Sequence, residues 1–399
     1  MSDPVAPHDG VARTTGSPLE DLAGRIRRAL DRVIDPEIRR PITELDMVGD
    51  IAVDAIGAAN VAIRLTIVGC PAARTIEADV RAAVAGVPGV TATHVDVGVM
   101  TPEQRRALTE RLRGPGRREM PFTADSLTRV IAVTSGKGGV GKSTVTANLA
   151  VALAASGLAV GIVDADVHGF SIPGLLGLED PDHPGRAVRP TRVDDMILPP
   201  VAHGVKVISI GMFVDDPSTA VAWRGPMLHR TISQFLTDVY FGDLDVLLLD
   251  LPPGTGDVAI SVGQLLPHAE VLVVTTPQSA AADVAERSGV VARQTGQRVV
   301  GVVENMAAFV GPDGSVIDVF GSGGGAEVAA RLSVGQNDTV PLLASIPLSP
   351  ALRQGGDTGR PVVLGEPSDA AAAAISRLAR DVATLGRGLS GRSLGVRVR

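Results

Sequence analysis

Nine consecutive residues at positions 136–144 carry the clearest chemical signal in this chain. They read Gly136-Lys137-Gly138-Gly139-Val140-Gly141-Lys142-Ser143-Thr144 and fit the pattern G-x-x-x-x-G-K-[ST]. The backbone N–H groups of such a glycine-rich loop surround the phosphates of a nucleotide. We expect Lys142 to reach the terminal phosphates and the Ser143 hydroxyl to help hold Mg²⁺. The loop therefore predicts binding of a nucleoside triphosphate together with its metal ion.

The loop lies between a predicted strand and a predicted helix. Residues 130–134 form an apolar run typical of a buried strand, and residues 142–156 place Leu149 and Leu153 on one helical face. Gly157 supplies the expected end of that helix. Unpaired N–H groups and the dipole at the start of a helix favour an anion. The phosphates are therefore expected at the N-terminus of this helix.

Two further predicted strands end in aspartates. The strand at 159–163 leads to Asp164 and Asp166, and the strand at 245–250 ends at Asp250. Open α/β sheets bind their ligands at the carboxyl ends of the strands, so these side chains should gather beside the loop. We expect Asp166 to orient the attacking water and Asp250 to meet Mg²⁺ through a water molecule.

The segment directly after Asp250 has the composition of a nucleotide-sensing loop. Residues 251–257 read Leu-Pro-Pro-Gly-Thr-Gly-Asp, with glycines whose backbone N–H groups can contact a γ-phosphate. Loops of this kind change between ordered and disordered states when the nucleotide is hydrolysed. We therefore interpret residues 251–257 as a switch rather than as a purely structural turn.

A dinucleotide-binding dehydrogenase is the main competing interpretation of a glycine-rich turn between a strand and a helix. The dehydrogenase turn requires a close-packing glycine where this chain has Lys142-Ser143. It is also followed, about 20 residues on, by an isolated acidic residue, whereas this chain has an Asp-x-Asp pair that suits Mg²⁺ better. The motif therefore favours a nucleoside triphosphatase.

Composition excludes several functional classes. The chain has 399 residues, which suggests two or three domains. Aromatic residues make up only 2% and the net charge is −7, so neither base stacking nor a basic field supports nucleic-acid binding. We find no signal peptide, no apolar run approaching the roughly 18 residues of a membrane span, and only one cysteine. We expect a cytoplasmic protein that binds neither nucleic acid nor membrane.

The chain divides into two predicted domains with disordered ends. Residues 1–16 are expected to be disordered, 17–112 to form a small α+β domain, 113–125 a linker, 126–382 the ATPase domain and 383–399 a disordered basic tail. The fold class is α/β, a P-loop NTPase with a mostly parallel sheet and helices on both faces. Its predicted strands are 130–134, 159–163, 205–210, 245–250, 270–275 and 299–304.

Six further motifs follow the loop along the chain, and their order is typical of one protein family. They are Asp164–Pro173, Trp223–Met227, Asp250–Asp257, Thr276–Gln278, Glu304–Met306 and Phe320–Gly325. With the loop, they make residues 125–365 closely resemble the Mrp/ApbC-type iron–sulfur cluster carrier ATPases, relatives of the nitrogenase iron protein and of MinD. Upstream, Asp35-Pro36-Glu37 and Thr66–Pro71 are similar to a small iron–sulfur assembly domain often fused ahead of such ATPases.

The resemblance implies an ATP-hydrolysing homodimer that acts in iron–sulfur cluster assembly, with cluster-assembly proteins or apoprotein clients as partners. Lys137, the second lysine of the loop, marks the deviant P-loop and resembles the lysine that reaches the nucleotide of the partner subunit in this superfamily. By the same resemblance, Asn305 contacts the adenine, and Trp223–Met227 lies near the dimer interface.

The chain departs from this family at the cluster ligands. The family has a C-x-x-C pair that bridges a [4Fe–4S] cluster at the dimer interface, and the corresponding positions here are Gly311 and Gly314. Four thiolates for such a cluster cannot come from the ATPase domains of a dimer. A hairpin built on Pro312-Asp313-Gly314 is predicted there instead.

The single cysteine, Cys70, lies in the N-terminal domain just before a predicted helix. Because a helix N-terminus lowers the pKa of a thiol, we expect an acidified Cys70 that can act as a thiol or cluster ligand. The competing interpretation is a small buried hydrophobic residue. Two Cys70 thiolates of a dimer would need external thiols to hold a [2Fe–2S] or transient cluster.

Two functions remain open from the sequence. The first is an ATPase that binds iron–sulfur clusters or transfers them to apoproteins. The second is a nucleotide-dependent interaction switch, resembling MinD, that recruits a partner and carries no cluster itself. The whole-chain resemblance favours the first function, and the replacement of the cysteine pair by glycines favours the second.

Overall fold

The computed structural model describes residues 18–114, 120–167, 169–183, 185–214, 225–311, 313–334 and 338–385. The predictions for residues 1–16, for the tail beyond 385, and for Trp223, Arg224 and Pro312 lie outside these ranges. The chain forms two compact units, divided between Leu112 and Arg113, and each is described by itself. Within the described ranges, no helix is both long and apolar enough to cross a membrane.

The N-terminal unit is a small α+β domain with a three-stranded sheet. Strand β1 pairs with β2 in antiparallel fashion, and β2 pairs with β3 in parallel fashion. Helices α1 and α2 pack against each other and bury Ile26, Leu30, Ile76 and Val80 at helical spacing. The elements are α1 Pro18–Leu30, β1 Val48–Val53, β2 Ala58–Leu65, α2 Ala73–Ala85, β3 Ala92–Val99 and α3 Pro102–Arg113.

Helix α3 is the last element of this unit and has few apolar residues. Leu108 is its single buried large apolar residue, and charged side chains cover most of the remaining surface. The hydrophobic periodicity that identifies an amphipathic helix is therefore weak in this segment.

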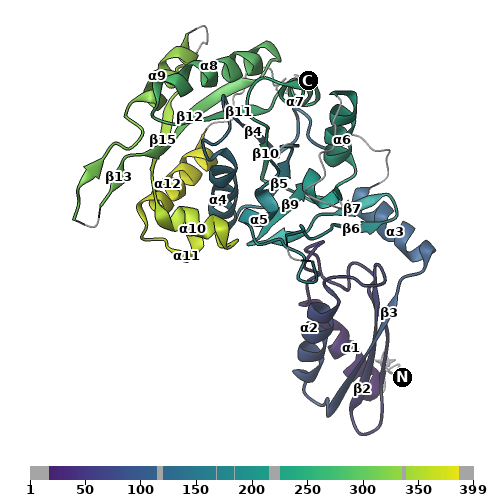
Figure 1. Cartoon of the computed structure of the whole chain (residues 1–399). Helices are drawn as coiled ribbons and strands as arrows, with labels where there is room; N and C mark the ends of the chain where they lie inside the picture. Colours follow the sequence, from purple (N-terminus) through teal and green to yellow (C-terminus); the bar gives the residue numbers. More distant parts are fainter. Residues whose placement is uncertain are drawn as a thin grey trace, which may run out of the picture. The chain divides into compact units, whose positions relative to one another are not determined.

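The C-terminal unit is an α/β domain around an eight-stranded sheet (Figure 1). The strand order is β15-β12-β11-β4-β10-β5-β9-β8, and all neighbours are parallel except β8 with β9. Helix α4 packs against α12 and helix α8 against α9, and Figure 1 shows these two pairs on opposite faces of the sheet. The predicted fold class, a mostly parallel sheet with helices on both faces, is confirmed.

All six predicted strands of this sheet are present. The two edge strands were missed: β15 because only Ile346 of its residues is buried and its apolar run is short, and β8 because it has only two residues. The strands of the sheet are β4 Arg129–Ser135, β5 Val160–Asp164, β8 Val201–Ala202, β9 Val205–Ser209, β10 Val246–Asp250, β11 Glu270–Thr275, β12 Arg298–Ala307 and β15 Leu342–Pro347. Two antiparallel hairpins accompany it, β6 Thr191–Val193 with β7 Met196–Leu198 and β13 Phe309–Val310 with β14 Val316–Ile317.

The helices of this unit cover the sheet and connect its strands. They are α4 Lys142–Ala155, α5 Ile172–Leu175, the 3-10 helix η1 Ile210–Phe213, α6 Gly225–Thr237, α7 Asp257–Leu265, α8 Ser279–Gln294, α9 Gly324–Ser333, α10 Pro350–Asp357, α11 Val362–Gly365 and α12 Ala370–Thr384.

Three completely buried central strands bring the predicted site residues to one edge of the sheet. Strands β4, β5 and β10 are buried at every position, and β10 lies between the other two. In this register Asp250 is the neighbour of Asp164 on one side and of Val133 on the other. Parallel strands share one carboxyl edge, so the loop after β4 and both aspartates meet there.

The environment of Cys70 corrects one expectation from the sequence. Cys70 precedes α2 but is only 6% exposed. Burial, followed by the negative charge of Glu37, raises the pKa of its thiol to about 11, although N–H groups of Ala72 and Ala73 lower it. The prediction of an acidified thiol is therefore wrong. Burial of the thiol raises its pKa more than the N–H groups at the start of the helix lower it.

Cys70 should consequently react slowly with iodoacetamide at pH 8, at about one tenth or less of the rate of a free thiol, because access and thiolate fraction are both low. The rate should climb as the pH approaches 11. Mass spectrometry of the intact protein measures it without ambiguity, since the chain has one cysteine.

The matched control for this experiment is the same chain unfolded in guanidinium. A native rate equal to the unfolded rate at pH 8 would contradict the burial of the thiol. The folded thiol keeps its proton to higher pH than the unfolded one, so its contribution to stability is present below about pH 8.5 and is lost as the pH rises further.

Candidate nucleotide-binding site

The loop between β4 and α4 requires glycine for conformation and for space. Gly139 and Gly141 have φ values of 78° and 77°, a left-handed region that residues with a Cβ rarely adopt. A Cβ at Gly141 would lie 2.3 Å from Asn305 Nδ2, and one at Gly136 would lie 2.3 Å from the backbone N of Ala285. The loop is therefore packed closely against β12 at one end and against α8 at the other.

The carboxylate of Asp250 is the centre of the polar contacts at this loop. It is completely buried at the end of β10. Lys142 Nζ lies 2.6 Å from Asp250 Oδ2, and the Ser143 hydroxyl donates to the same oxygen at 2.5 Å. The structure thus brings the three predicted residues Lys142, Ser143 and Asp250 into direct contact.

Thr146 contributes to the same cluster and was not predicted. Its side chain is fully buried, and its hydroxyl lies 2.8 Å from Asp250 Oδ1 and 2.9 Å from the carbonyl of Lys142. Residues four apart in a helix lie on one face, so its position one turn after Lys142 is the signal that could have identified it. With Thr146, both oxygens of the Asp250 carboxylate are occupied.

The two aspartates after β5 have different surroundings. Asp164 is fully buried, and its carboxylate accepts from Ser209 Oγ at 2.9 Å and from the N–H groups of Asp166 at 3.2 Å and Ile172 at 3.3 Å. Burial, and next the charge of Asp250, raises the pKa of the Asp164 carboxyl above its usual range. Asp164 therefore holds the backbone of the following segment in place.

Asp166 lies closer to the loop lysine. Its Oδ2 is 3.9 Å from Lys142 Nζ, and its Oδ1 accepts from the N–H of Gly169 at 3.1 Å. Of the two aspartates, Asp166 is the one that forms an ion pair with the loop lysine, and its position beside the phosphates stays a prediction. Its role in orienting water stays a prediction.

Lys137 makes a separate contact, away from the Asp250 cluster. Its Nζ donates to Gln278 Oε1 at 2.8 Å, and its carbonyl accepts from Ser135 Oγ at 3.1 Å. Gln278 precedes α8, so this helix contacts the loop both through Gln278 and through the close approach at Gly136. The role of Lys137 across a dimer interface stays a prediction.

Asn305 is buried beside the loop, near the end of β12. Its Nδ2 donates to the carbonyl of Val140 at 2.9 Å. The neighbouring Glu304 accepts from the N–H of Gly325 at 2.8 Å and from Ser345 Oγ at 3.1 Å, which fixes the end of the strand. The structure therefore brings Asn305 to the nucleotide loop, and its contact with adenine stays a prediction.

The predicted switch segment after β10 begins against the loop strand. The N–H of Gly254 donates to the carbonyl of Ser135 at 2.8 Å, and Gly254 has a φ of 88°. Asp257 begins α7 and lies against α6, since a Cβ at Gly225 would come within 2.7 Å of its Oδ2. Thus the described end of the tryptophan-containing motif, Gly225–Met227, contacts the end of the switch segment.

The predicted hairpin occupies the positions where the family has its cysteine pair. The N–H of Gly311 donates to the carbonyl of Ser315 at 2.8 Å, and Gly314 has a φ of 78°. Neither glycine offers a metal ligand, and Cys70 lies in the other unit. Among the residues that the structure describes, no group of three or more His, Cys, Asp or Glu side chains is placed to hold a metal ion.

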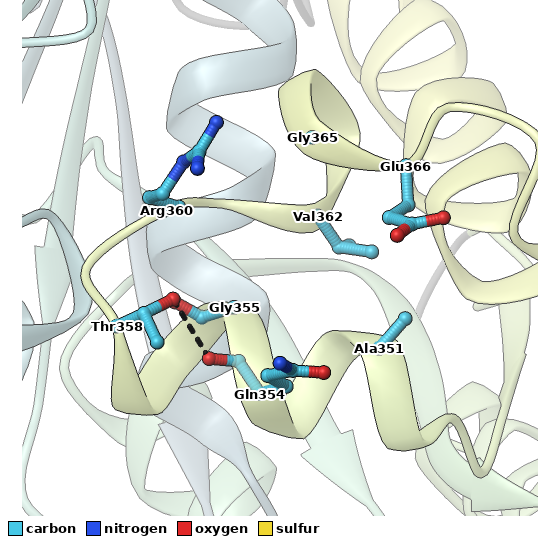
Figure 2. Close-up of a pocket in the computed structure, with 8 residues that line it drawn as sticks. All are labelled: Ala351, Gln354, Gly355, Thr358, Arg360, Val362, Gly365 and Glu366. Carbon is cyan, nitrogen blue, oxygen red and sulfur yellow. Dashed lines mark hydrogen bonds between the residues drawn. The ribbon is translucent and has the colours of Figure 1, made fainter.

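A separate hollow between α10 and α11 contains none of these residues. It has a volume of about 260 Å³, and Figure 2 shows the Thr358 hydroxyl bonded to the carbonyl of Gln354 beside it. Half of its eight lining residues have exposed polar side chains, so it lies at the surface. Its lining residues are Ala351, Gln354, Gly355, Thr358, Arg360, Val362, Gly365 and Glu366.

Comparison with known families matches both units of the chain. Residues 126–383 match the family described as NUBPL iron-transfer P-loop NTPase. Residues 24–97 match the family described as iron-sulfur cluster assembly protein. The two matches follow each other along the chain in the order of the two units.

Curated relatives extend over nearly the whole chain. The iron-sulfur cluster carrier protein of Mycobacterium tuberculosis is 58% identical over 94% of this chain and 97% of its own length. The protein of the same name from Synechocystis is 41% identical over 88% of this chain and 94% of its own length.

Among solved structures, a nucleotide-binding protein in complex with ADP from Archaeoglobus fulgidus aligns with a TM-score of 0.49 and 37% identity, covering 60% of this chain and 92% of that one. On the family matches and the curated relatives, this chain belongs to the family of iron–sulfur cluster carrier P-loop NTPases.

Proposed function

We propose that this protein is a Mg²⁺-dependent ATPase that acts as a homodimer in the assembly or delivery of iron–sulfur clusters. One observation carries the nucleotide part of the proposal, the direct contact of Lys142, Ser143 and Asp250 at the carboxyl edge of the sheet. The cluster part is supported by the name that the curated relatives share. We further propose that the protein acts in the cytoplasm.

The residues at the loop fit a magnesium nucleotide. Backbone N–H groups of the glycine-rich loop would bind the phosphates, and Lys142 would offset their charge. Ser143 Oγ and Asp250 Oδ2 lie 2.5 Å apart, and Mg²⁺ prefers such oxygen ligands. Ser143 would hold the ion directly and Asp250 through water, and the bound ion would neutralise charge on the phosphates.

Hydrolysis would need a positioned water and a further positive charge. Asp166 lies beside the loop and would orient the water, since its carboxylate is 3.9 Å from Lys142 Nζ. Lys137 lies on the side of the loop that faces Gln278. In the proposed homodimer it would leave Gln278 and stabilise the charge on the nucleotide of the other copy.

The cargo cannot be bound by protein thiolates alone. A [4Fe–4S] cluster takes four cysteine ligands, and a homodimer of this chain contains only its two copies of Cys70. Each is buried, with a pKa raised to about 11, so neither is a ready ligand in this conformation. We propose that thiols of the client apoprotein or of small molecules hold the cluster during transfer.

A second candidate function is a nucleotide-dependent interaction switch that carries no cluster. The single, buried cysteine favours this function. The family matches in both units and the naming of the relatives favour cluster transfer. We therefore retain the switch as the alternative and not as the leading proposal.

Substitution of Lys137 by alanine should separate hydrolysis from binding. We expect the ATPase rate of Lys137→Ala to fall about 100-fold, because a charge that acts in the transition state is lost. The dissociation constant for ATP should stay within about threefold of the wild-type value. Steady-state hydrolysis and equilibrium binding of a fluorescent ATP analogue measure the two quantities.

Lys142→Ala is the matched control, since it removes the other loop lysine and should abolish nucleotide binding itself. Thermal unfolding of both variants shows whether each is folded. Wild-type turnover by Lys137→Ala would remove Lys137 from the mechanism.

Anaerobic reconstitution with iron and sulfide tests the cargo proposal. We expect no stable cluster after desalting without an external thiol, and equal behaviour of wild type and Cys70→Ala, because Cys70 is buried and protonated. Transfer to an apoprotein should proceed when a small thiol is present. Iron and sulfide per dimer, and activity of the apoprotein, are the readouts.

Two other results of this experiment would change the conclusion. A stable cluster in wild type that Cys70→Ala loses would place the cargo on the N-terminal unit. Intact ATP hydrolysis without transfer under any thiol condition would favour the cluster-free switch.

A further inference from the structure

The hydroxyl of Thr146 faces two acceptors and has one proton to donate. Its Oγ1 lies 2.9 Å from the carbonyl oxygen of Lys142 and 2.8 Å from Asp250 Oδ1. In an α-helix that carbonyl also accepts the backbone N–H four residues on. A carboxylate oxygen binds a donor more strongly, because it is charged. The hydroxyl proton is therefore donated to Asp250.

This hydrogen bond lies out of reach of solvent. Thr146 and Asp250 are both completely buried, so water cannot take the place of the hydroxyl at Oδ1. Among the contacts of the described residues, Thr146 is the one side-chain donor to that oxygen. A buried acceptor that loses its donor is left without compensation. The orientation of the Asp250 carboxylate therefore depends on Thr146 at Oδ1.

The donors to the other oxygen are groups that a magnesium nucleotide would take over. Oδ2 of Asp250 accepts from Lys142 Nζ at 2.6 Å and from the Ser143 hydroxyl at 2.5 Å. In the proposed nucleotide complex, the lysine turns to the phosphates and the serine binds the ion. Both donors then leave Oδ2, which becomes the oxygen that meets the water shell of Mg²⁺. Thr146 stays in place, because its bond is to Oδ1.

A buried helical threonine can have a purely structural part, in which its hydroxyl bonds to the carbonyl four residues back. Thr237 in α6 is an example, with Oγ1 3.0 Å from the carbonyl of Ser233 and 2.9 Å from Asp238 Oδ1. The carboxylate in that case belongs to the adjacent residue. Thr146 instead reaches a residue 104 positions away along the chain. Its bond joins α4 to the end of β10, where the nucleotide is expected.

We propose that Thr146 is a positioning residue for the magnesium ion of this site. Its hydroxyl holds Oδ1 of Asp250, so that Oδ2 stays directed at the water shell of the ion after the loop lysine and serine have turned to the nucleotide. The inference rests on the proposed Mg²⁺-dependent ATPase and adds a residue that itself touches neither the ion nor the phosphates.

Thr146→Val tests the proposal, because valine has the shape of threonine and lacks the hydroxyl. Loss of a group that orients a metal-binding side chain typically lowers metal affinity about 10- to 100-fold. We expect the dissociation constant of Mn²⁺, used as the probe, from the protein–ADP complex to rise about tenfold. Electron paramagnetic resonance of free Mn²⁺ measures it. The ATPase rate should need about tenfold more Mg²⁺ to reach half of its maximum.

Binding of ADP in EDTA separates this effect from damage to the phosphate loop. Its dissociation constant in Thr146→Val should stay within about twofold of wild type, because the loop N–H groups and Lys142 still bind the phosphates. Thr146→Ser keeps the hydroxyl and should restore Mn²⁺ affinity to within about twofold of wild type.

Thr237→Val is the matched control. It removes the same pair of bonds, to a helix carbonyl and to a carboxylate, at the end of α6. It should leave Mn²⁺ affinity unchanged, even where the melting temperature falls. Thermal unfolding shows whether each variant is folded, and Thr146→Ala takes the place of Thr146→Val if the valine variant does not fold.

Three results would overturn the inference while leaving the ATPase intact. They are Mn²⁺ affinity of Thr146→Val within about twofold of wild type, equal weakening by Thr237→Val, and failure of Thr146→Ser to restore the affinity. Failure of the proposed function looks different. A wild-type protein whose ADP complex binds no Mn²⁺, or that hydrolyses ATP equally well in EDTA, refutes the magnesium nucleotide site and the part of Thr146 together.

Discussion

The nucleotide-binding edge depends on the contacts of one buried group, the carboxylate of Asp250. It joins the central strand β10 to the first two turns of α4 through Lys142, Ser143 and Thr146. Removing one partner of a buried ion pair typically costs about 3–5 kcal/mol, because a charge is left without compensation. A bound magnesium nucleotide would compete for the same lysine and hydroxyl, so in the proposed cycle nucleotide binding and packing of the loop are linked.

Two other buried carboxylates support this edge without belonging to the proposed chemistry. Asp164 accepts from Ser209 and from the backbone that leads to α5, and Glu304 ties the end of β12 to Gly325 and Ser345. Each holds a segment that borders the nucleotide loop. The functional side chains therefore rest on strand ends whose positions are fixed by hydrogen bonds between elements far apart in the sequence.

The chain combines the architecture of a cluster carrier family with a single thiol. That thiol is buried in the N-terminal unit, where loss of solvent and the charge of Glu37 keep it protonated. At the positions of the cysteine pair the chain has a hairpin with exposed valine and isoleucine side chains. With one cysteine, the chain lacks the protein thiolates that a shared cluster would need.

The sequence by itself determined the fold class, the phosphate loop and the aspartates at the strand ends, because these depend on local patterns such as a buried run followed by glycines or by an acid. Only the tertiary structure showed that Thr146 contacts Asp250 and that Cys70 keeps its proton. A hydroxyl one turn into a helix matters only when β10 brings Asp250 against it. A thiol at a helix start is acidified only if water and neighbouring charges allow it, and both are set by residues distant in the chain.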